Sequence, residues 1–385
     1  MKIMGYRRKN GQIGIRNHIV VLPASICASE VATKISNNVD GSIALSHQHG
    51  CCQMGDDYEQ TLRTLSGLGR NPNVAAVLVV GLGCESIKID NLVYDIRKTE
   101  KIVTSLNIQE SGDSLKAIKE GIKLLMEMKE SIVDMQRQKV DIKELIVGLE
   151  CGGSDATSGI TSNPAVGVAS DKLISFGGTV ILSETTELIG AEHIIAKRTS
   201  NKSVGNSLKK KVKKMEKQAV SSGLDIRGCQ PTPGNIRGGL TTIEEKSLGC
   251  IYKAGSTPIQ EVLEYGQSPS VTGLCFMDTP GQDIESITGM LAGGAQIIVF
   301  TTGLGTPTGA PIAPVIKITG NSQTYNKMKV NIDINAGKII DDAIPIKKVG
   351  EEIITEIISV CNGKLTKAER HKHREFAISR IGVTF

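Results

Sequence analysis

The sequence has no tryptophan, and aromatic residues make up only 3% of its 385 residues. A core of this size must therefore be built from isoleucine, valine, leucine and alanine, as in parallel sheets that helices cover on both faces. An apolar run near the start, IVVLPA, is too short to cross a bilayer and lacks the flanks of a signal peptide. We therefore expect a cytoplasmic protein without a membrane partner.

Nucleotide-binding signatures are also missing. No GxGxxG follows the first predicted strand, and GxxxxGK[ST] does not occur, which argues against NAD and ATP as ligands. The net charge of +5 is mild, and the lysine block at 209–214 has no interleaved aromatic residues. That block is typical of a solvated helix face, so we expect a small anionic ligand and no nucleic acid.

The nine cysteines are odd in number and form no CxxC motif. In a cytosolic chain such cysteines indicate metal binding or catalysis before they indicate disulfides. Cys27, Cys250 and Cys361 fall in apolar helical patterns, and we expect them in the core. The chemical candidates are Cys51, Cys52, Cys84, Cys151 and Cys275.

Strands and helices alternate along the sequence, which predicts right-handed crossovers and mostly parallel pairing. Composition changes within 200–240, where a loop rich in proline and glycine follows a lysine-rich helix. We predict an α/β fold with a mostly parallel Rossmann-like domain over 1–220 and a second α/β domain over 221–385 that completes the site. The second domain is expected to have helices near 258–265, 282–292 and 349–361 and strands near 271–276, 296–301 and 330–334.

Polar and sulfur-bearing side chains follow five predicted strands. These strand ends lie at 47–52, 84–86, 150–155, 183–187 and 275–281. Open α/β sheets bind their ligands at the carboxyl ends of their strands. Thiolate, imidazole and carboxylate together suit Fe²⁺ or Zn²⁺. The plain alternative for LECGGSD is a glycine-rich turn with a buried cysteine.

Such a metal can hold a substrate carboxylate and acidify its α-proton. His47 or His49 would then remove the proton, because histidine is a base near neutral pH. Lys246 would stabilise the charge that develops. Loss of a β-hydroxyl with the help of a general acid would complete a dehydration.

Seven segments, from GYRRKNGQIGIRN through HQHGC, GLGCE, LECGGSDATSGITSNPAVGVASD, SETTELIGAEH and GNIRGGLTTIEEKSLG to FTTGLGTPTGAPIAPVIKITGN, carry a family resemblance. The chain resembles the altronate/galactarate dehydratase family from about residue 5 to residue 337. The resemblance implies an iron-dependent hydro-lyase that converts a sugar acid into a 2-keto-3-deoxy acid. It also includes the large subunit of sulfolactate sulfo-lyase, in which sulfite leaves instead of water.

The resemblance places functional roles on particular positions. The catalytic candidates are His47, His49, Glu187 and Lys246. The metal-ligand candidates, for Fe²⁺ or Mn²⁺, are Cys51, Cys84, Glu85, Cys151 and Glu184. The substrate-binding candidates are Arg16, Asn163, Asn235, Arg237 and Thr302.

Single-chain members of the family resemble a small β-rich module followed by a body like this one, whereas this sequence starts at the body. We therefore expect a separate small subunit as partner, and a homo-oligomer. Two further hypotheses stay open. One is an iron–sulfur dehydratase with Cys51, Cys84 and Cys151 as cluster ligands, and the other is a non-catalytic subunit that binds a metal or an acid.

Overall fold

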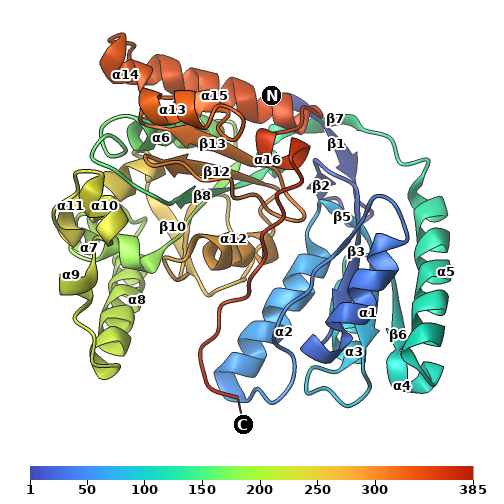
Figure 1. The fold of residues 1–385 in the computed structure, drawn as a ribbon. Coiled ribbons are helices and arrows are strands. Elements are labelled where there is room, and N and C mark those ends of the chain that lie inside the picture. Colours follow the sequence, from blue (N-terminus) through green and yellow to red (C-terminus); the bar gives the residue numbers. More distant parts are fainter. Residues whose placement is uncertain (385) are drawn as a thin grey trace.

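A computed structural model describes residues 1–384, so Phe385, the last residue of the predicted second domain, lies outside the described residues. Two parallel sheets organise the fold, and a small antiparallel sheet lies beside them (Figure 1). The four-stranded sheet has the order β4 (Ser42–Ala44), β3 (His18–Pro23), β5 (Val74–Gly81) and β6 (Ile102–Asn107). The three-stranded sheet has the order β2 (Ile13–Gly14), β1 (Lys2–Arg7) and β7 (Gln138–Asp141).

The seven-stranded sheet holds the rest of the chain. Its order is β10 (Ile259–Leu263), β11 (Gly273–Met277), β9 (Thr179–Leu182), β8 (Ile146–Cys151), β12 (Ile297–Thr302), β13 (Val315–Thr319) and β14 (Ile334–Asn335). All its neighbouring strands run parallel. The predicted α/β class is thereby confirmed.

Helices cover both parallel sheets. We call the four-stranded sheet with its helices the first unit, and the seven-stranded sheet with its helices the second unit. Those of the first unit are α1 (Ile26–Asn37), α2 (Gly55–Arg70), α3 (Ile89–Arg97), α4 (Ile108–Ser111) and α5 (Ser114–Ile132). The longer helices of the second unit are α6 (Ser162–Ser175), α8 (Lys202–Ser221), α11 (Ile243–Cys250), α12 (Asp283–Ala292) and α15 (Ile346–Cys361). Its shorter ones are α7 (Glu192–Ile195), α9 (Ile226–Cys229), α10 (Pro233–Arg237), α13 (Ser322–Lys327), α14 (Lys338–Asp341) and α16 (Lys367–Arg370). No helix within residues 1–384 is both long and apolar enough to span a bilayer.

Strand pairing divides the chain earlier than the predicted boundary at residue 220. Strands β8 and β9 pair with β12 and β11, so residues 146–182 belong to the same sheet as the C-terminal strands. The four-stranded sheet ends with β6 at Asn107. The Pro/Gly-rich segment at 228–240, expected as a loop, contains helix α10 and connects elements within the second unit.

Two elements of the second unit differ from the sequence-based prediction. Residues 258–265, predicted as a helix, contain strand β10, which pairs parallel to β11. The strand predicted at 330–334 is only the two-residue β14, while β13 was missed. Short apolar segments fit either type of element, and here the neighbouring strand decides.

The two parallel sheets are joined by a common core and by buried amides. Apolar residues of α2, β3 and β5 pack with those of α12, β11 and β12 in one cluster. Asn73 is fully buried, and its amide nitrogen donates to the carbonyls of Gln296 and Ile312 at 2.8 and 2.9 Å. Its amide oxygen accepts from the backbone nitrogens of Ile15 and Arg16. One side chain therefore ties three segments that lie far apart in the sequence.

Replacement of Asn73 should strongly destabilise this junction. Asn73→Ala leaves four buried backbone groups without a partner, and we expect a loss of at least about 3 kcal/mol in the free energy of unfolding, measured by urea denaturation. The matched control is Asn206→Ala, because Asn206 is exposed on α8. It should change the stability by no more than about 0.5 kcal/mol. Equal effects of the two substitutions would contradict this role of Asn73.

Candidate active site

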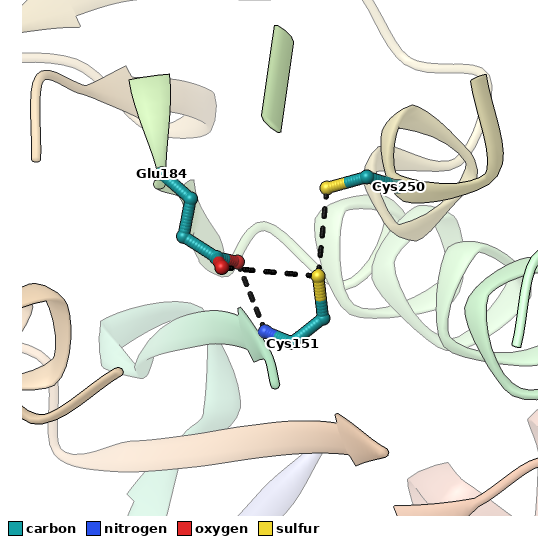
Figure 2. Close-up of side chains that lie close together, drawn as sticks. All are labelled: Cys151, Glu184 and Cys250. Carbon is teal, nitrogen blue, oxygen red and sulfur yellow. Dashed lines mark hydrogen bonds between the residues drawn. The ribbon is translucent and has the colours of Figure 1, made fainter. Parts of the chain in front are cut away.

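Two thiols and a carboxylate meet at the carboxyl edge of the seven-stranded sheet. Cys151, Glu184 and Cys250 are buried, and one ligand atom from each lies within 4.8 Å of the others. The Cys151 sulfur is 3.6 Å from the Cys250 sulfur and 3.8 Å from Glu184 Oε1. Figure 2 shows the three side chains converging from three different elements. Among residues 1–384, this is the only group of three or more such side chains with that spacing.

Each member of the cluster is positioned by its own element. Cys151 is the last residue of β8, and Glu184 follows the neighbouring strand β9. Glu184 has a left-handed backbone with φ of 69°, which costs a non-glycine residue roughly 1–2 kcal/mol. Cys250 ends α11, a helix whose N-cap Thr242 accepts from the backbone nitrogen of Glu245. A strained glutamate in a buried site indicates a functional role for its carboxylate.

The Glu184 carboxylate is fixed by donors to one of its oxygens. Lys253 donates to Oε2 at 2.6 Å, and the backbone nitrogen of Cys151 donates to the same atom at 2.9 Å. The side chains of Lys253 and Glu184 are both fully buried. The remaining oxygen, Oε1, faces the Cys151 thiol and is the one left to bind a ligand.

The geometry and chemistry of the cluster fit a transition metal. Two sulfur ligands at about 2.3 Å from a tetrahedral ion lie about 3.8 Å apart, close to the 3.6 Å found here. Two thiolates and one carboxylate suit Zn²⁺ or Fe²⁺ and leave a fourth position for substrate. Glu187, whose charge interacts with that of Glu184, has an Oε2 atom that is buried without a hydrogen-bond partner.

Further acidic groups surround the cluster. Burial raises the pKa of Glu187, against the effect of Lys246, whose ammonium is 2.8 Å from Glu187 Oε1. Burial lowers the pKa of Lys246, but the charge and hydrogen bond of Glu187, together with the charges of Cys151 and Glu184, outweigh burial and raise the value to about 12. The carboxylate of Asp283 lies against Gly152, where a Cβ would be 2.3 Å from Oδ2. Burial, and then the charge of Glu184, raise the pKa of Asp283 to about 7.

Glu150 completes this acidic group on the preceding position of β8. Its Oε2 accepts from Ser286 at 2.6 Å, while Oε1 has no partner. Burial and the charge of Glu184 raise its pKa well above the usual range. Carboxyl groups therefore outnumber the two ammonium groups of Lys246 and Lys253, a charge balance that favours a bound cation.

A cavity of about 210 Å³ opens beside the cluster, with Asn163, Tyr252 and Lys246 in its wall. It is smaller than the ~300–1,000 Å³ of sites for drug-sized ligands, so it suits a small substrate. Lys246 contacts both the cavity and Glu187 and thus connects the substrate space with the acidic cluster.

The structure brings together four of the predicted site residues, namely Cys151, Glu184, Glu187 and Lys246. Sequence reasoning missed Cys250, Lys253 and Asp283. Cys250 was expected in the core, and it is indeed buried, but its sulfur contacts Cys151. Its place four residues after Lys246, on one face of a helix, was the signal that could have found it.

The predicted candidates of the first unit lie on the other parallel sheet, in the loops after β4 and β5. His47 and His49 are buried, and their Nε2 atoms donate to the carbonyls of Pro23 and Ile378. Burial lowers the pKa of His47 to about 4. Cys51 and Cys84 do not join the Cys151 group within the described chain, and Glu85 accepts from the backbone of its own loop. The single metal site expected from both loops is therefore not assembled.

The predicted substrate-binding residues have varied positions. Arg16 is buried and pairs with Glu369 at 2.6 Å. Asn163 lines the cavity and also accepts from Thr301, while Arg237 is exposed. Asn235 donates to the Ser154 carbonyl. The Thr302 hydroxyl accepts from the Gly305 backbone and is fully buried.

Two family models match this chain. Residues 5–133 match the second domain of D-galactarate dehydratase/altronate hydrolase, and residues 142–384 match the C-terminal domain of D-galactarate/altronate dehydratase. The chain belongs to the D-galactarate/altronate dehydratase family. The predicted family and the predicted lyase class are thereby confirmed. The first match ends at residue 133 and the second begins at residue 142, between β6 of the four-stranded sheet and β8 of the seven-stranded sheet.

Relatives of this family member match almost its whole length. Altronate dehydratase of Bacillus subtilis is 36% identical over 99% of this chain and 78% of its own length. Altronate dehydratase of Escherichia coli is 38% identical over 98% of this chain and 78% of its own length. The (2R)-sulfolactate sulfo-lyase subunit beta of Chromohalobacter salexigens is 38% identical over 98% of this chain and 97% of its own length.

Removal of Lys253 should leave a buried charge on Glu184 unpaired. We expect Lys253→Met to cost about 3–5 kcal/mol in the free energy of unfolding at pH 7, measured by urea denaturation. In the double variant Lys253→Met/Glu184→Gln, the loss should be clearly smaller than the sum of the two single losses. Additive losses would mean that the two groups do not stabilise each other.

Proposed function

We propose that this protein is a metal-dependent lyase that eliminates water from a sugar acid of the altronate or galactarate class and yields a 2-keto-3-deoxy acid. The observation that carries the proposal is the buried group of Cys151, Glu184 and Cys250 beside a small cavity. Family membership supplies the reaction type, because two of the relatives are named altronate dehydratase.

Cys151, Cys250 and Glu184 would hold the metal, with Glu184 Oε1 as its oxygen ligand. Fe²⁺ is the proposed ion, because thiolates with a carboxylate suit a borderline divalent metal. When bound, such an ion acts as a Lewis acid on a substrate carboxylate and lowers the pKa of the α-proton. Lys253 donates to Glu184 Oε2 and so leaves Oε1 turned towards the Cys151 thiol.

Glu187 is the proposed base for the α-proton. Its Oε2 has no partner, whereas Oε1 is held by Lys246, so one oxygen is oriented and free. Its raised pKa makes it a stronger base than an exposed carboxylate. Lys246, which stays protonated with a pKa of about 12, stabilises the negative charge that develops on the substrate. This assignment replaces His47 and His49, whose rings bind backbone carbonyls on the other sheet.

Asp283 is the proposed general acid for the leaving hydroxyl. With a pKa of about 7, it is partly protonated at neutral pH and can donate a proton. An acid and a base are expected in one site when the surroundings shift the pKa values of two carboxyl groups there. A candidate acid in the site favours loss of water, which needs protonation, over loss of sulfite.

A second candidate reaction is the elimination of sulfite from sulfolactate. It is favoured by the match to nearly the full length of the sulfo-lyase subunit beta, at 97% of that protein. The removal of the α-proton by Glu187 would be common to both reactions. The name of that relative, a subunit beta, supports a separate partner chain. We propose that this partner is a small subunit and that such pairs form a homo-oligomer.

Both the metal content and the turnover should depend on Cys151 and Cys250. Protein purified without oxygen should contain about one iron and no acid-labile sulfide per chain, and with Fe²⁺ it should release a 2-keto acid from altronate or galactarate. Cys151→Ser should lose the iron and lower turnover by at least about 100-fold, because the substitution removes a sulfur atom that binds the metal directly. Assays should include the small subunit where the chain alone is inactive.

The matched control is Cys229→Ser, since Cys229 is an exposed cysteine outside the site. It should keep both iron and turnover. Full activity of Cys151→Ser would remove the cluster from the reaction, and several irons with matching sulfide would replace the mononuclear site with an iron–sulfur cluster. Release of sulfite from sulfolactate without turnover of sugar acids would select the second candidate.

The role of Asp283 gives a pH dependence with a defined sign. An acid must be protonated to act, so kcat for dehydration should fall as the pH rises through about 7, the pKa of Asp283. Asp283→Asn should lower kcat by about 100-fold or more and abolish this alkaline limb. Glu285→Gln is a suitable control, since Glu285 lies in the same helical turn and its charge acts on Tyr265. An unchanged pH profile in Asp283→Asn would exclude Asp283 as the acid.

A further inference from the structure

Residues 373–382, which we call the C-terminal strap, lie across the carboxyl edges of both parallel sheets. They form no helix or strand, and Figure 1 shows them in red, running from α16 to a position beside α2. The strap is nevertheless packed into the protein, since Ile378 is 1% exposed and belongs with Phe376 to the apolar cluster that joins the two sheets. Glu375 Oε2 accepts from the backbone nitrogen of Gly309, in the loop after β12, at 2.8 Å.

The first unit holds the strap through two side chains. His49 Nε2, in the loop after β4, donates to the Ile378 carbonyl at 3.0 Å. The amide nitrogen of Gln60, on α2, donates to the Ser379 carbonyl at 2.9 Å. The strap is thus tied to both units at the edge where open α/β sheets bind their ligands.

Tyr265, in the loop after β10, is a buried junction between the strap and both units. Its hydroxyl accepts from the backbone nitrogen of Ser379 at 3.2 Å and donates to the Glu285 carbonyl at 2.6 Å. Its own carbonyl accepts from the Arg63 guanidinium of α2 at 2.8 Å. Its ring lies against α12, where a Cβ at Gly289 would be 2.7 Å from the ring atom Cε2. Both the ring and the hydroxyl of Tyr265 therefore hold α12 in place.

The first turn of α12 carries side chains that contact the proposed active site. The Asp283 carboxylate faces the loop after β8. The Ser286 hydroxyl donates to Glu150 Oε2 at 2.6 Å and accepts from the Thr279 hydroxyl at 3.1 Å. The Thr279 hydroxyl in turn accepts from the backbone nitrogen of Glu184 at 2.7 Å. The position of this turn therefore sets where the proposed general acid lies relative to the cluster.

We propose that Tyr265 is a positioning residue for Asp283 and that the C-terminal strap holds Tyr265 in this role. The inference rests on the proposed function, in which Asp283 is the general acid. Tyr265 acts through the backbone of Glu285, two residues from Asp283, and not through the substrate. Such an indirect contact matters because a displacement of a reacting group by about 1 Å can lower a rate by about 100-fold.

Tyr265→Phe tests the proposal, because it keeps the ring and removes the hydroxyl. With altronate or galactarate, Fe²⁺ and the small subunit, kcat should fall by about tenfold while KM stays within about twofold of the wild-type value. Hydrogen exchange, followed by mass spectrometry, should become at least about tenfold faster in peptides 375–382 and 283–289. The matched control is Tyr325→Phe, since Tyr325 is half-buried on α13 and its ring contact with Lys367 does not need the hydroxyl. The control should change none of these quantities.

Gln60→Leu tests the role of the strap, because it removes the donor to the Ser379 carbonyl and leaves Tyr265 unchanged. Its exchange in both peptides should rise and its kcat should fall. In Tyr265→Phe/Gln60→Leu, kcat should be clearly higher than the product of the two single effects predicts, since both changes act on one helical turn. If circular dichroism shows that Tyr265→Phe does not fold, Gln60→Leu alone decides the proposal by its exchange and kcat.

Hydrogen exchange separates this proposal from the proposed function. A wild type that turns over neither sugar acid would contradict the proposed function, and exchange in peptide 283–289 would still decide whether Tyr265 positions the turn that carries Asp283. Faster exchange confined to peptide 375–382 would overturn the proposal. A kcat of folded Tyr265→Phe within about twofold of that of an active wild type would overturn it as well.

Discussion

The ion pair between Lys253 and Glu184 is the constraint on which the active site depends. Both side chains are fully buried, and their charged atoms are 2.6 Å apart. A charge removed from water in this way is stable only with a partner, so each residue requires the other. Because Lys253 occupies one oxygen of Glu184, the other oxygen faces Cys151. A single electrostatic requirement thus sets the orientation of the carboxylate that completes the cluster.

The sheet supplies the rest of the arrangement. Cys151 and Glu184 leave adjacent parallel strands in the same direction, so their side chains meet without any long loop. The third member, Cys250, comes from a helix that crosses this edge and is tied to α6 by the bond from Asn163 to the Gly249 carbonyl. The acidic residues Glu187 and Asp283 then surround a site that holds more carboxyl groups than ammonium groups. Burial, with a smaller contribution from the charge of Glu184, raises the pKa values of both groups.

The two parallel sheets serve different purposes in this fold. The seven-stranded sheet carries the buried cluster and the cavity, whereas the four-stranded sheet carries exposed thiols. Buried amides such as Asn73 hold the sheets in a fixed relation. The rings of His47 and His49, which are catalytic candidates in the sequence, bind backbone carbonyls in the structure. Residue type alone therefore did not show which candidates meet in the buried cluster.

The sequence by itself determined the α/β class, the family, and the position of Cys151 and Glu184 at strand ends, because apolar runs and the polar residues that follow them are local features. It did not determine that β8 and β9 belong with the C-terminal strands, that residues 259–263 form a strand, or that Cys250 and Lys253 complete the site. Strand pairing joins Cys151 to Thr301, 150 positions further along the chain, and side-chain packing brings the sulfur atoms of Cys151 and Cys250 together across 99 positions. Such contacts depend on how the whole chain packs, and only the tertiary structure decided them.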